Sequence, residues 1–516
     1  MKKLFLLALG ILLFYTGAFA QPKTEVDLKV LDEYYAQMVE NWEVPGASIG
    51  IVKDGELLFT GNYGTMETGS NQKPNEHTLY AIASNSKAFT SAMIGMLVQE
   101  GKLSWDDKVQ KYLPYFELYD PWVSSHTTIR DILSHRVGLG TFSGDNIWYK
   151  SELPAEDIIK RIKHVPQAYA FRAGYGYSNL MYITAGEIIE TITGKSWAEN
   201  VQERILDPLD MDRTIASVDE LASKGNFATP HARKNEENYA IPWAKWDNVA
   251  ATGGLISSVS DISRWMIFNL NHGIIGQDTL LTPATRNNVW RPHNNFYVDH
   301  TQENDLNTHF SAYGLGWGLR DYHGRMMVRH TGGYDGMITA VTLIPDENLG
   351  VVVLTNGPKS PIIAATYYAL DKFLGVAEEK DWSAALLESA NQGAENDTRI
   401  EDRMNARVLD TQPIISPQNF VGDYYSKLYG DIHISRKDDQ LRLEFSHSPL
   451  LSATLTHWHY DVWKINWEHP QAWFSFGTIK IQSNSKLEVT GLEFDVPNDD
   501  FFFEEIKPKK VKTSSE

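Results

Sequence analysis

One stretch of the chain reads SNSKAFTSAMIGMLVQEG, from Ser84 to Gly101. Between Lys87 and Glu100 apolar residues fall on nearly every side of a helix, and Gly101 is typical of a residue that ends one. A helix on the protein surface would carry a polar face. We therefore expect this helix to lie inside a domain.

The start of the helix carries a Ser-x-x-Lys pattern, Ser84 and Lys87. Residues three apart lie on one face of a helix, so the amine can reach the hydroxyl. The positive potential of a helix N-terminus favours a deprotonated serine oxygen and a neutral amine that can take its proton. The pattern therefore predicts an activated serine nucleophile.

Three other segments match catalytic patterns by their letters. Ser-x-x-Lys recurs at residues 70–73 and 483–486, but the first runs into Pro74 and the second lies between predicted strands. Residues 46–50 fit the Gly-x-Ser-x-Gly elbow, which requires a strand, a turn and a helix in that order. Ser48 is followed by more strand, so we interpret it as a strand residue.

The sequence around the helix predicts an antiparallel sheet. Residues 45–64 read as a hairpin, and consecutive strands are expected at 313–319, 326–330, 337–344 and 349–355, followed by a helix at 361–374. Helical stretches at 157–163 and 181–193 indicate a helical subdomain. The predicted fold class is α/β, an antiparallel sheet flanked by helices with a helical subdomain.

The length of 516 residues is too great for one core and predicts two or three domains. We expect the sheet and its helices to occupy residues 21–375. Residues 376–412 are charged and weakly patterned and predict a linker that is partly helical. Short strands and turns follow, so residues 413–516 are expected to form a small all-β domain.

Residues 1–20 predict a signal peptide, because Lys2 and Lys3 precede an apolar run and Ala18 to Ala20 form a small-x-small cleavage site. The apolar run is shorter than the ~20 residues that cross a bilayer, which disfavours a stable membrane anchor. We therefore expect an exported protein, periplasmic or secreted.

Composition excludes several classes of site and partner. The chain has no cysteine, which excludes disulfides, a thiol nucleophile and thiolate metal ligands. A formal charge of −19 argues against nucleic acid as a partner, because nucleic acid requires a basic face. No metal-ligand motif is present among the 16 histidines, and His457 and His459 are interpreted as structural. No metal or organic cofactor is expected.

Two further motifs follow the Ser-x-x-Lys pattern in order: Tyr177-Ser178-Asn179 in a turn before a helix, and His330-Thr331-Gly332-Gly333 at the end of a strand. Together they resemble the three motifs of the class C β-lactamase family, which also holds penicillin-binding carboxypeptidases, D-amino-acid-specific peptidases and esterases. The resemblance covers roughly residues 30–375 and includes flanking text such as LSHRVGL at 133–139 and YGLGWG at 313–318. The last domain looks like the lipocalin-like β-barrel found on some relatives.

The resemblance implies a role for each motif residue. Ser84 would attack a carbonyl, while Lys87 and Tyr177 share the proton transfers. Asn179 would orient Lys87 and a substrate amide. His330 and Thr331 would contact substrate, and the backbone N–H groups of Ser84 and Gly333 would form an oxyanion hole.

His330 departs from the family pattern, which usually has a lysine there. Because histidine is shorter and is often uncharged near neutral pH, the sequence favours D-amino-acid peptides or esters over lactams as substrates. We expect an acyl-enzyme on Ser84 and a small-molecule or peptide substrate. The alternatives are a β-lactamase or penicillin-binding carboxypeptidase, and a non-catalytic module that binds peptide or peptidoglycan. A homo-oligomer is left open.

Overall fold

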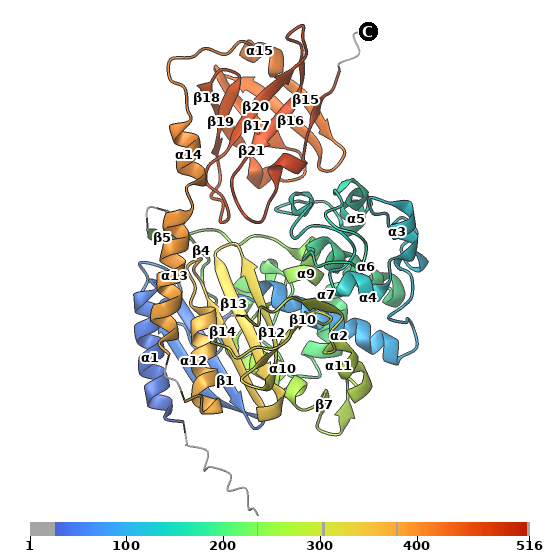
Figure 1. Ribbon diagram of the computed structural model, residues 1–516, viewed down its shortest axis with the longest axis vertical. Coiled ribbons are helices and arrows are strands. Elements are labelled where there is room, and N and C mark those ends of the chain that lie inside the picture. The colour runs from blue at the N-terminus through green and yellow to red at the C-terminus, as the bar shows by residue number, and fades with distance from the viewer. Residues whose placement is uncertain (1–25, 235, 302–304, 378–379, 513–516) are drawn as a thin grey trace, which may run out of the picture.

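An antiparallel sheet of eight strands forms the centre of the larger domain (Figure 1). The computed structural model describes residues 26–234, 236–301, 305–377 and 380–512, so the predicted signal peptide lies outside the described residues. The strand order is β2 (Glu56–Gly64), β1 (Gly46–Lys53), β14 (Leu349–Thr355), β13 (Met337–Ile344), β12 (Arg325–Tyr334), β11 (Gly318–Tyr322), β10 (Ser311–Tyr313) and β9 (Asn294–Phe296).

One predicted strand is wrong. Residues 313–319 form the end of β10, a turn and the start of β11 rather than a single strand. Gly316 has φ +77°, in the left-handed region that an extended strand does not visit. The turn carries the chain from one edge of the sheet back along its neighbour.

Helices cover both faces of the sheet because its central strand is apolar on both sides. On β14, Val351 and Val353 pack with α1 (Leu28–Asn41), α12 (Ile362–Leu374) and the start of α13 (Trp382–Asn396). The alternate residues, Val352 and Leu354, face the core of α2 (Ser86–Gln99) and α10 (Val259–Leu270). Alternation along a strand assigns successive side chains to opposite faces. The predicted helix at 84–100 is thus an interior helix, as its composition indicates.

A helical subdomain stands beside the sheet. Its helices are α3 (Pro121–His126), α4 (Ile129–Leu133), α5 (Ala155–Arg161), α6 (Asn179–Thr193), α7 (Trp197–Val201), α8 (Leu221–Lys224), α9 (Ala250–Gly253) and α11 (Pro283–Val289). Short β-ribbons pair β3 (Tyr80–Ala81) with β6 (Ile256–Ser257), β4 (His231–Lys234) with β5 (Glu237–Ala240), and β7 (Ile274–Ile275) with β8 (Asp278–Thr279).

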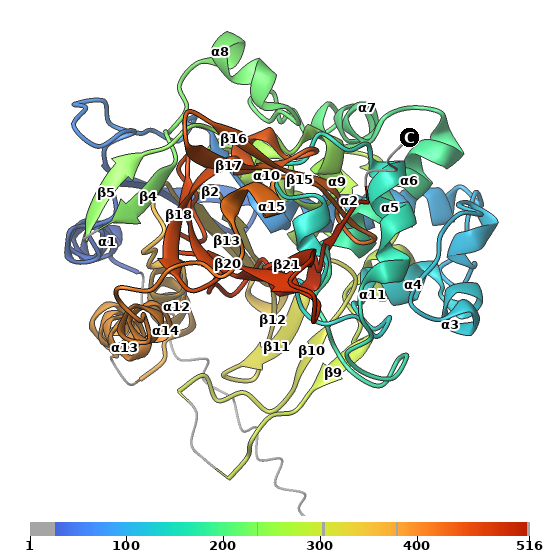
Figure 2. The same cartoon turned by 90° about the horizontal axis from the view of Figure 1, so that it is seen from above.

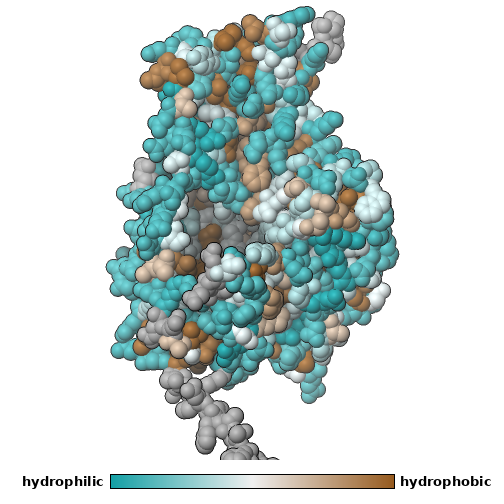
Figure 3. Space-filling model, viewed as in Figure 1, coloured by the Kyte–Doolittle hydropathy of each residue, from teal (hydrophilic) through white to brown (hydrophobic). Residues whose placement is uncertain are grey.

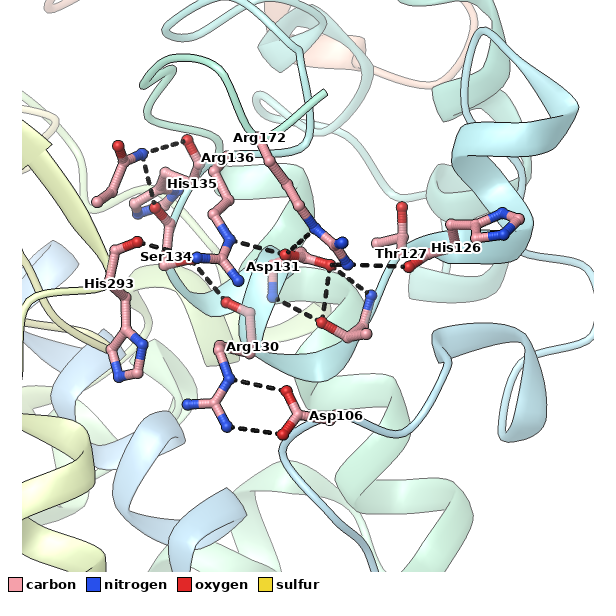
Figure 4. A network of polar contacts seen from close by, with 12 residues as sticks. Asp106, His126, Thr127, Arg130, Asp131, Ser134, His135, Arg136, Arg172 and His293 are labelled. Atoms are coloured by element: carbon pink, nitrogen blue, oxygen red, sulfur yellow. Dashed lines mark hydrogen bonds and ion pairs between the residues drawn. The ribbon is translucent and has the colours of Figure 1, made fainter. Parts of the chain in front are cut away.

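Asp131, a fully buried carboxylate at the start of α4, organises the loops of this subdomain (Figure 4). Its oxygens accept hydrogen bonds from the Arg136 Nε at 2.7 Å and from the Arg172 Nη2 at 2.6 Å. Thr128 caps the helix: its Oγ1 accepts from the Asp131 N–H, while its own N–H and hydroxyl donate to the same carboxylate. Arg136 lies in the loop after α4 and Arg172 in the loop before α6, and the Arg172 N–H donates to the Arg136 carbonyl oxygen, so Asp131 fixes both loops at once.

The chain ends in a closed barrel of eight antiparallel strands (Figures 1 and 2). The strands are β15 (Gly422–Ser426), β16 (Gly430–Lys437), β17 (Gln440–Phe445), β18 (Ala453–His459), β19 (Val462–Trp467), β20 (Thr478–Ser483), β21 (Val489–Asp495) and β22 (Lys509–Lys510). The barrel is preceded by α13, α14 (Arg399–Asn405) and α15 (Pro417–Phe420). The predicted fold class, a sheet with helices followed by a small β-barrel, is confirmed.

The surface in Figure 3 is mainly hydrophilic, with hydrophobic side chains in small patches near the barrel end. None of the helices in the described ranges has the length and hydrophobicity needed to cross a bilayer. His457 and His459 bond to the Tyr460 carbonyl and the Val408 N–H. Within the described residues, no group of three or more histidine, aspartate or glutamate side chains is arranged to hold a metal ion.

Replacing Asp131 by asparagine is expected to lower the free energy of unfolding by about 3–5 kcal/mol, because two guanidinium groups would lose their buried counter-charge. Denaturation of the wild type and the variant in guanidinium chloride measures the difference. The matched control is Asp106→Asn, which removes an exposed partner of Arg130 and should cost only about 0–1 kcal/mol. Equal losses in the two variants would contradict the role assigned to Asp131.

Candidate active site

All three sequence motifs contribute to one cavity of about 390 Å³ between the sheet, the helical subdomain and the barrel. Ser84 lines it from the turn that precedes α2. Tyr177 and Asn179 reach it from the start of α6, while His330, Thr331 and Gly333 line it from β12. The structure therefore brings the predicted site residues together, with Lys87 directly beneath Ser84.

Ser84 lies in a 3-10 turn, Ala83–Asn85, that runs directly into α2 at Ser86. Ala83 has φ +48°, a conformation that costs energy for any residue with a Cβ. The turn also packs tightly against β12, because a Cβ added at Gly332 would lie 2.2 Å from the Ile82 carbonyl oxygen. The glycine lets the strand approach the nucleophile, and Ser84 remains partly exposed to the cavity.

Lys87 is fully buried, and three oxygen atoms surround its amine. The Nζ lies 2.9 Å from the Ser84 Oγ, 2.8 Å from the Asn179 Oδ1 and 2.7 Å from the Thr252 carbonyl oxygen. Burial lowers the pKa of Lys87 well below its usual value. A neutral amine can donate to the two carbonyl oxygens and direct its lone pair at the serine hydroxyl.

Tyr177 lies beside this amine, with the Lys87 Nζ 4.8 Å from its ring centroid. Burial raises the pKa of Tyr177 well above its usual value, and the neighbouring Ser84 hydroxyl acts in the opposite direction. These shifts suit Tyr177 to donate a proton and Lys87, as a neutral amine, to accept one. His135 supports this turn from below: its ring lies 4.5 Å from that of Tyr177, and its Nδ1 accepts from the Ser178 N–H.

Two residues that the sequence analysis missed complete the hydrogen-bond chain around Lys87. The Asn179 Nδ2 donates to the Asp145 Oδ2 at 2.6 Å, which turns the Asn179 oxygen toward Lys87. The Thr252 Oγ1 donates to the Asn179 Oδ1 at 2.9 Å. Thr252 immediately precedes the pair Gly253-Gly254, whereas no sequence pattern marks Asp145.

His330 is buried, and burial disfavours the charged form of its ring. Burial lowers the pKa of His330 to about 3, and the nearby Lys87 acts in the same direction. Its Nε2 lies 3.0 Å from the Tyr313 hydroxyl. The motif therefore presents a neutral ring where relatives with lysine present a cation.

Two arginines that the sequence analysis did not single out add positive charge to the wall of the cavity. Arg320 on β11 and Arg329 on β12 line its wall, and neither makes an ion pair with a carboxylate in the described residues. Burial and the charge of Arg329 lower the pKa of Arg320. The Arg329 Nη1 donates only to the Tyr367 hydroxyl, at 3.3 Å.

The barrel closes the opposite end of the cavity with Trp473, Asp500 and Phe501. The Trp473 ring packs on Gly333, where an added Cβ would lie 3.0 Å from it, and its Nε1 donates to the Asp335 Oδ1 at 2.9 Å. Figure 2 shows the barrel lying over the sheet and the helical subdomain. The site is thus built by both domains.

Comparison with known proteins agrees with this geometry. A family model described as Beta-lactamase matches residues 31–372. The chain belongs to the β-lactamase family. A second model, described as a domain of unknown function (DUF3471), matches residues 406–510, which include the whole barrel.

Relatives within the β-lactamase family include a hydrolase. An unguisins hydrolase from Aspergillus campestris is 32% identical over 382 residues, which are 70% of this chain and 69% of the relative. Protein flp from Staphylococcus aureus (strain COL) is 28% identical over 336 residues, 63% of this chain and 62% of that protein. These similarities support a serine hydrolase of the β-lactamase fold.

Two solved structures share the fold. The octameric penicillin-binding protein homologue from Pyrococcus abyssi has a TM-score of 0.60 at 20% identity and covers 94% of this chain and 100% of its own. A penicillin-binding protein from Bacillus halodurans has a TM-score of 0.52 at 21% identity and covers 65% of this chain and 98% of its own. The first likeness extends over both domains of this β-lactamase-family chain.

The lowered pKa of Lys87 predicts the pH dependence of the reaction. A neutral Lys87 is the reactive form, so kcat/KM for an uncharged ester should fall as the pH falls through the pKa of Lys87 and stay high above it. Tyr177, with its raised pKa, should cause no loss up to about pH 9. A pH profile of kcat/KM measures this.

Two carboxylates of the cavity are expected to titrate near neutrality, since burial raises the pKa of Asp145 to about 7 and that of Asp500 to about 6. A double variant, Asp145→Asn with Asp500→Asn, separates them from Lys87, because a limb that belongs to Lys87 persists in it. Activity that rises only above pH 10 would contradict the lowered pKa of Lys87.

Proposed function

We propose that the chain is an exported serine hydrolase that forms an acyl-enzyme on Ser84 and hydrolyses D-amino-acid peptide bonds or ester bonds. The observation that carries the proposal is the 2.9 Å contact between the Ser84 Oγ and the buried amine of Lys87, at the edge of a cavity. Export rests on the signal-peptide pattern of residues 1–20.

Acylation begins when the Ser84 Oγ attacks the substrate carbonyl carbon and its proton passes to the neutral Lys87. The oxygen of the tetrahedral intermediate is stabilised by the N–H groups of Ser84 and Gly333, each worth ~3–4 kcal/mol in typical enzymes. Tyr177 then protonates the leaving amine or alcohol. The products are the Ser84 ester and the released group.

Deacylation reverses these roles with water as the nucleophile. Water takes the position of the departed group, Tyr177, left as a phenolate by acylation, accepts its proton, and the Ser84 oxygen leaves with the proton that Lys87 took during acylation. Asn179, held by Asp145 and Thr252, keeps the lysine amine directed at the serine throughout.

Neutral His330 supports the preference for peptides and esters over lactams, since it offers no cation to a lactam carboxylate. Arg320 and Arg329 favour a second candidate, a penicillin-binding carboxypeptidase, because they can bind a terminal carboxylate. The two solved structures that share this fold are named as a penicillin-binding protein homologue and a penicillin-binding protein, which supports the same candidate.

Intact-mass spectrometry tests the proposal. The wild type is expected to gain the acyl mass, or to turn over, with at least one of an activated ester, a D-amino-acid amide and a penicillin. Ser84→Ala should lose the adduct and reduce turnover by at least about 10³-fold. A long-lived penicillin adduct would favour the carboxypeptidase, and the absence of any adduct or turnover would leave only a binding module.

Replacing His330 by lysine is expected to raise kcat/KM for a penicillin relative to an uncharged ester by about tenfold, because a fixed cation would then face the lactam carboxylate. His330→Asn, which remains neutral, is the matched control and should not shift the ratio toward the penicillin. An unchanged preference in His330→Lys would remove the inference about this position.

A further inference from the structure

The end of the cavity that the barrel closes holds two carboxylates with no cation beside them. Asp145 comes from the helical subdomain and is buried, and Asp500 comes from a barrel loop and is half-buried. Neither forms an ion pair in the part of the chain that the structure describes. The Asp145 Oδ1 makes no hydrogen bond of regular geometry, although the Trp148 indole N–H is near enough to lower the pKa of this carboxyl, and the Asp500 carboxylate accepts no hydrogen bond from a described residue.

The nearest lysines are already engaged. Lys87 is surrounded by Ser84, Asn179 and the Thr252 carbonyl oxygen, and Lys150 pairs with Asp335 at 3.3 Å. Burial raises the pKa of Asp145 to about 7 and that of Asp500 to about 6. The charge of Asp500 contributes to the shift of Asp145, and the two carboxylates line the same cavity.

Aromatic rings enclose the same end of the cavity. Trp148, Trp246 and Phe501 all line it, with the Trp148 ring 5.1 Å from that of Trp246 and 6.1 Å from that of Phe501. Aromatic faces attract cations, and a desolvated carboxylate gains most from a cation that also donates hydrogen bonds. An ammonium group has three N–H donors and meets both requirements.

We infer that Asp145 and Asp500, with the rings of Trp148, Trp246 and Phe501, form a subsite for the ammonium group of an aminoacyl substrate. The inference rests on the proposed function and names its substrate class, amides and esters of amino acids whose amine is free. The subsite borders the nucleophile, because hydrogen bonds run from Ser84 through Lys87 and Asn179 to Asp145. An amine bound there belongs to the residue whose carbonyl Ser84 attacks.

The test compares substrates that differ only in the amine. The full chain is assayed with the p-nitroanilides of D-alanine and L-alanine, with their N-acetyl derivatives, and with p-nitrophenyl acetate. The wild type is expected to prefer a free-amine substrate over its acetylated form by about tenfold or more in kcat/KM. Asp500→Asn should reduce this ratio by about tenfold, and Asp500→Lys should abolish the preference.

The matched control is Asp499→Asn, the neighbouring carboxylate on the same loop. Asp499 is exposed and pairs with Arg399 at 2.7 Å, away from the cavity lining, so its removal should leave the substrate ratio unchanged. Because each result is a ratio measured within one variant, a change in the folded fraction does not alter it.

The outcomes separate this inference from the proposed function. If p-nitrophenyl acetate is hydrolysed in a Ser84-dependent reaction but the free amine gives no preference, or Asp500→Asn leaves the preference unchanged, the ammonium subsite is wrong and the hydrolase stands. If Ser84→Ala retains full turnover of the ester, the proposed function itself is wrong.

Discussion

The burial of one amine governs the architecture of this active site. Lys87 lies in the interior of the larger domain, where a charged ammonium would be costly and a neutral amine is favoured. Its three oxygen neighbours come from separate elements: Ser84 before α2, Asn179 at the start of α6 and Thr252 in α9. The amine therefore joins the helices of the subdomain to the nucleophile turn, and its environment supplies both packing and proton transfer.

Glycines on β12 let the backbone of the sheet approach the turn that carries Ser84. Gly332 brings β12 to the Ile82 carbonyl, and Gly333 leaves room for the Trp473 ring above it. Side chains at either position would separate the strand from the serine or from the barrel. The packing that positions the proposed oxyanion donors is thus the same packing that docks the second domain.

The sequence predicts the parts of the site that lie in short local patterns, and the fold class follows from hydrophobic periodicity. The Ser84, Tyr177 and His330 motifs each stand before or at the end of a regular element, where local spacing is informative. Asp145, Arg329 and Trp473 carry no such pattern, because their roles arise from contacts between distant segments. The strand expected at 313–319 failed for a related reason, since Gly316 introduces a turn within an otherwise apolar run.

The barrel changes the chemistry of the cleft as well as its shape. Without Asp500, Phe501 and Trp473, the cavity would retain the nucleophile and the two arginines but would lose one wall and one of its two unpaired carboxylates. With them, carboxylates line the cavity on the side of the barrel and guanidinium groups line it from β11 and β12, and Ser84 lines the same cavity. A substrate with an amine on one side of its scissile carbonyl and an acidic group on the other would align with this field, whereas the reversed orientation would set like charges against each other. In the proposed reaction, the contact between two domains that are separate in the sequence therefore sets the direction in which a substrate binds.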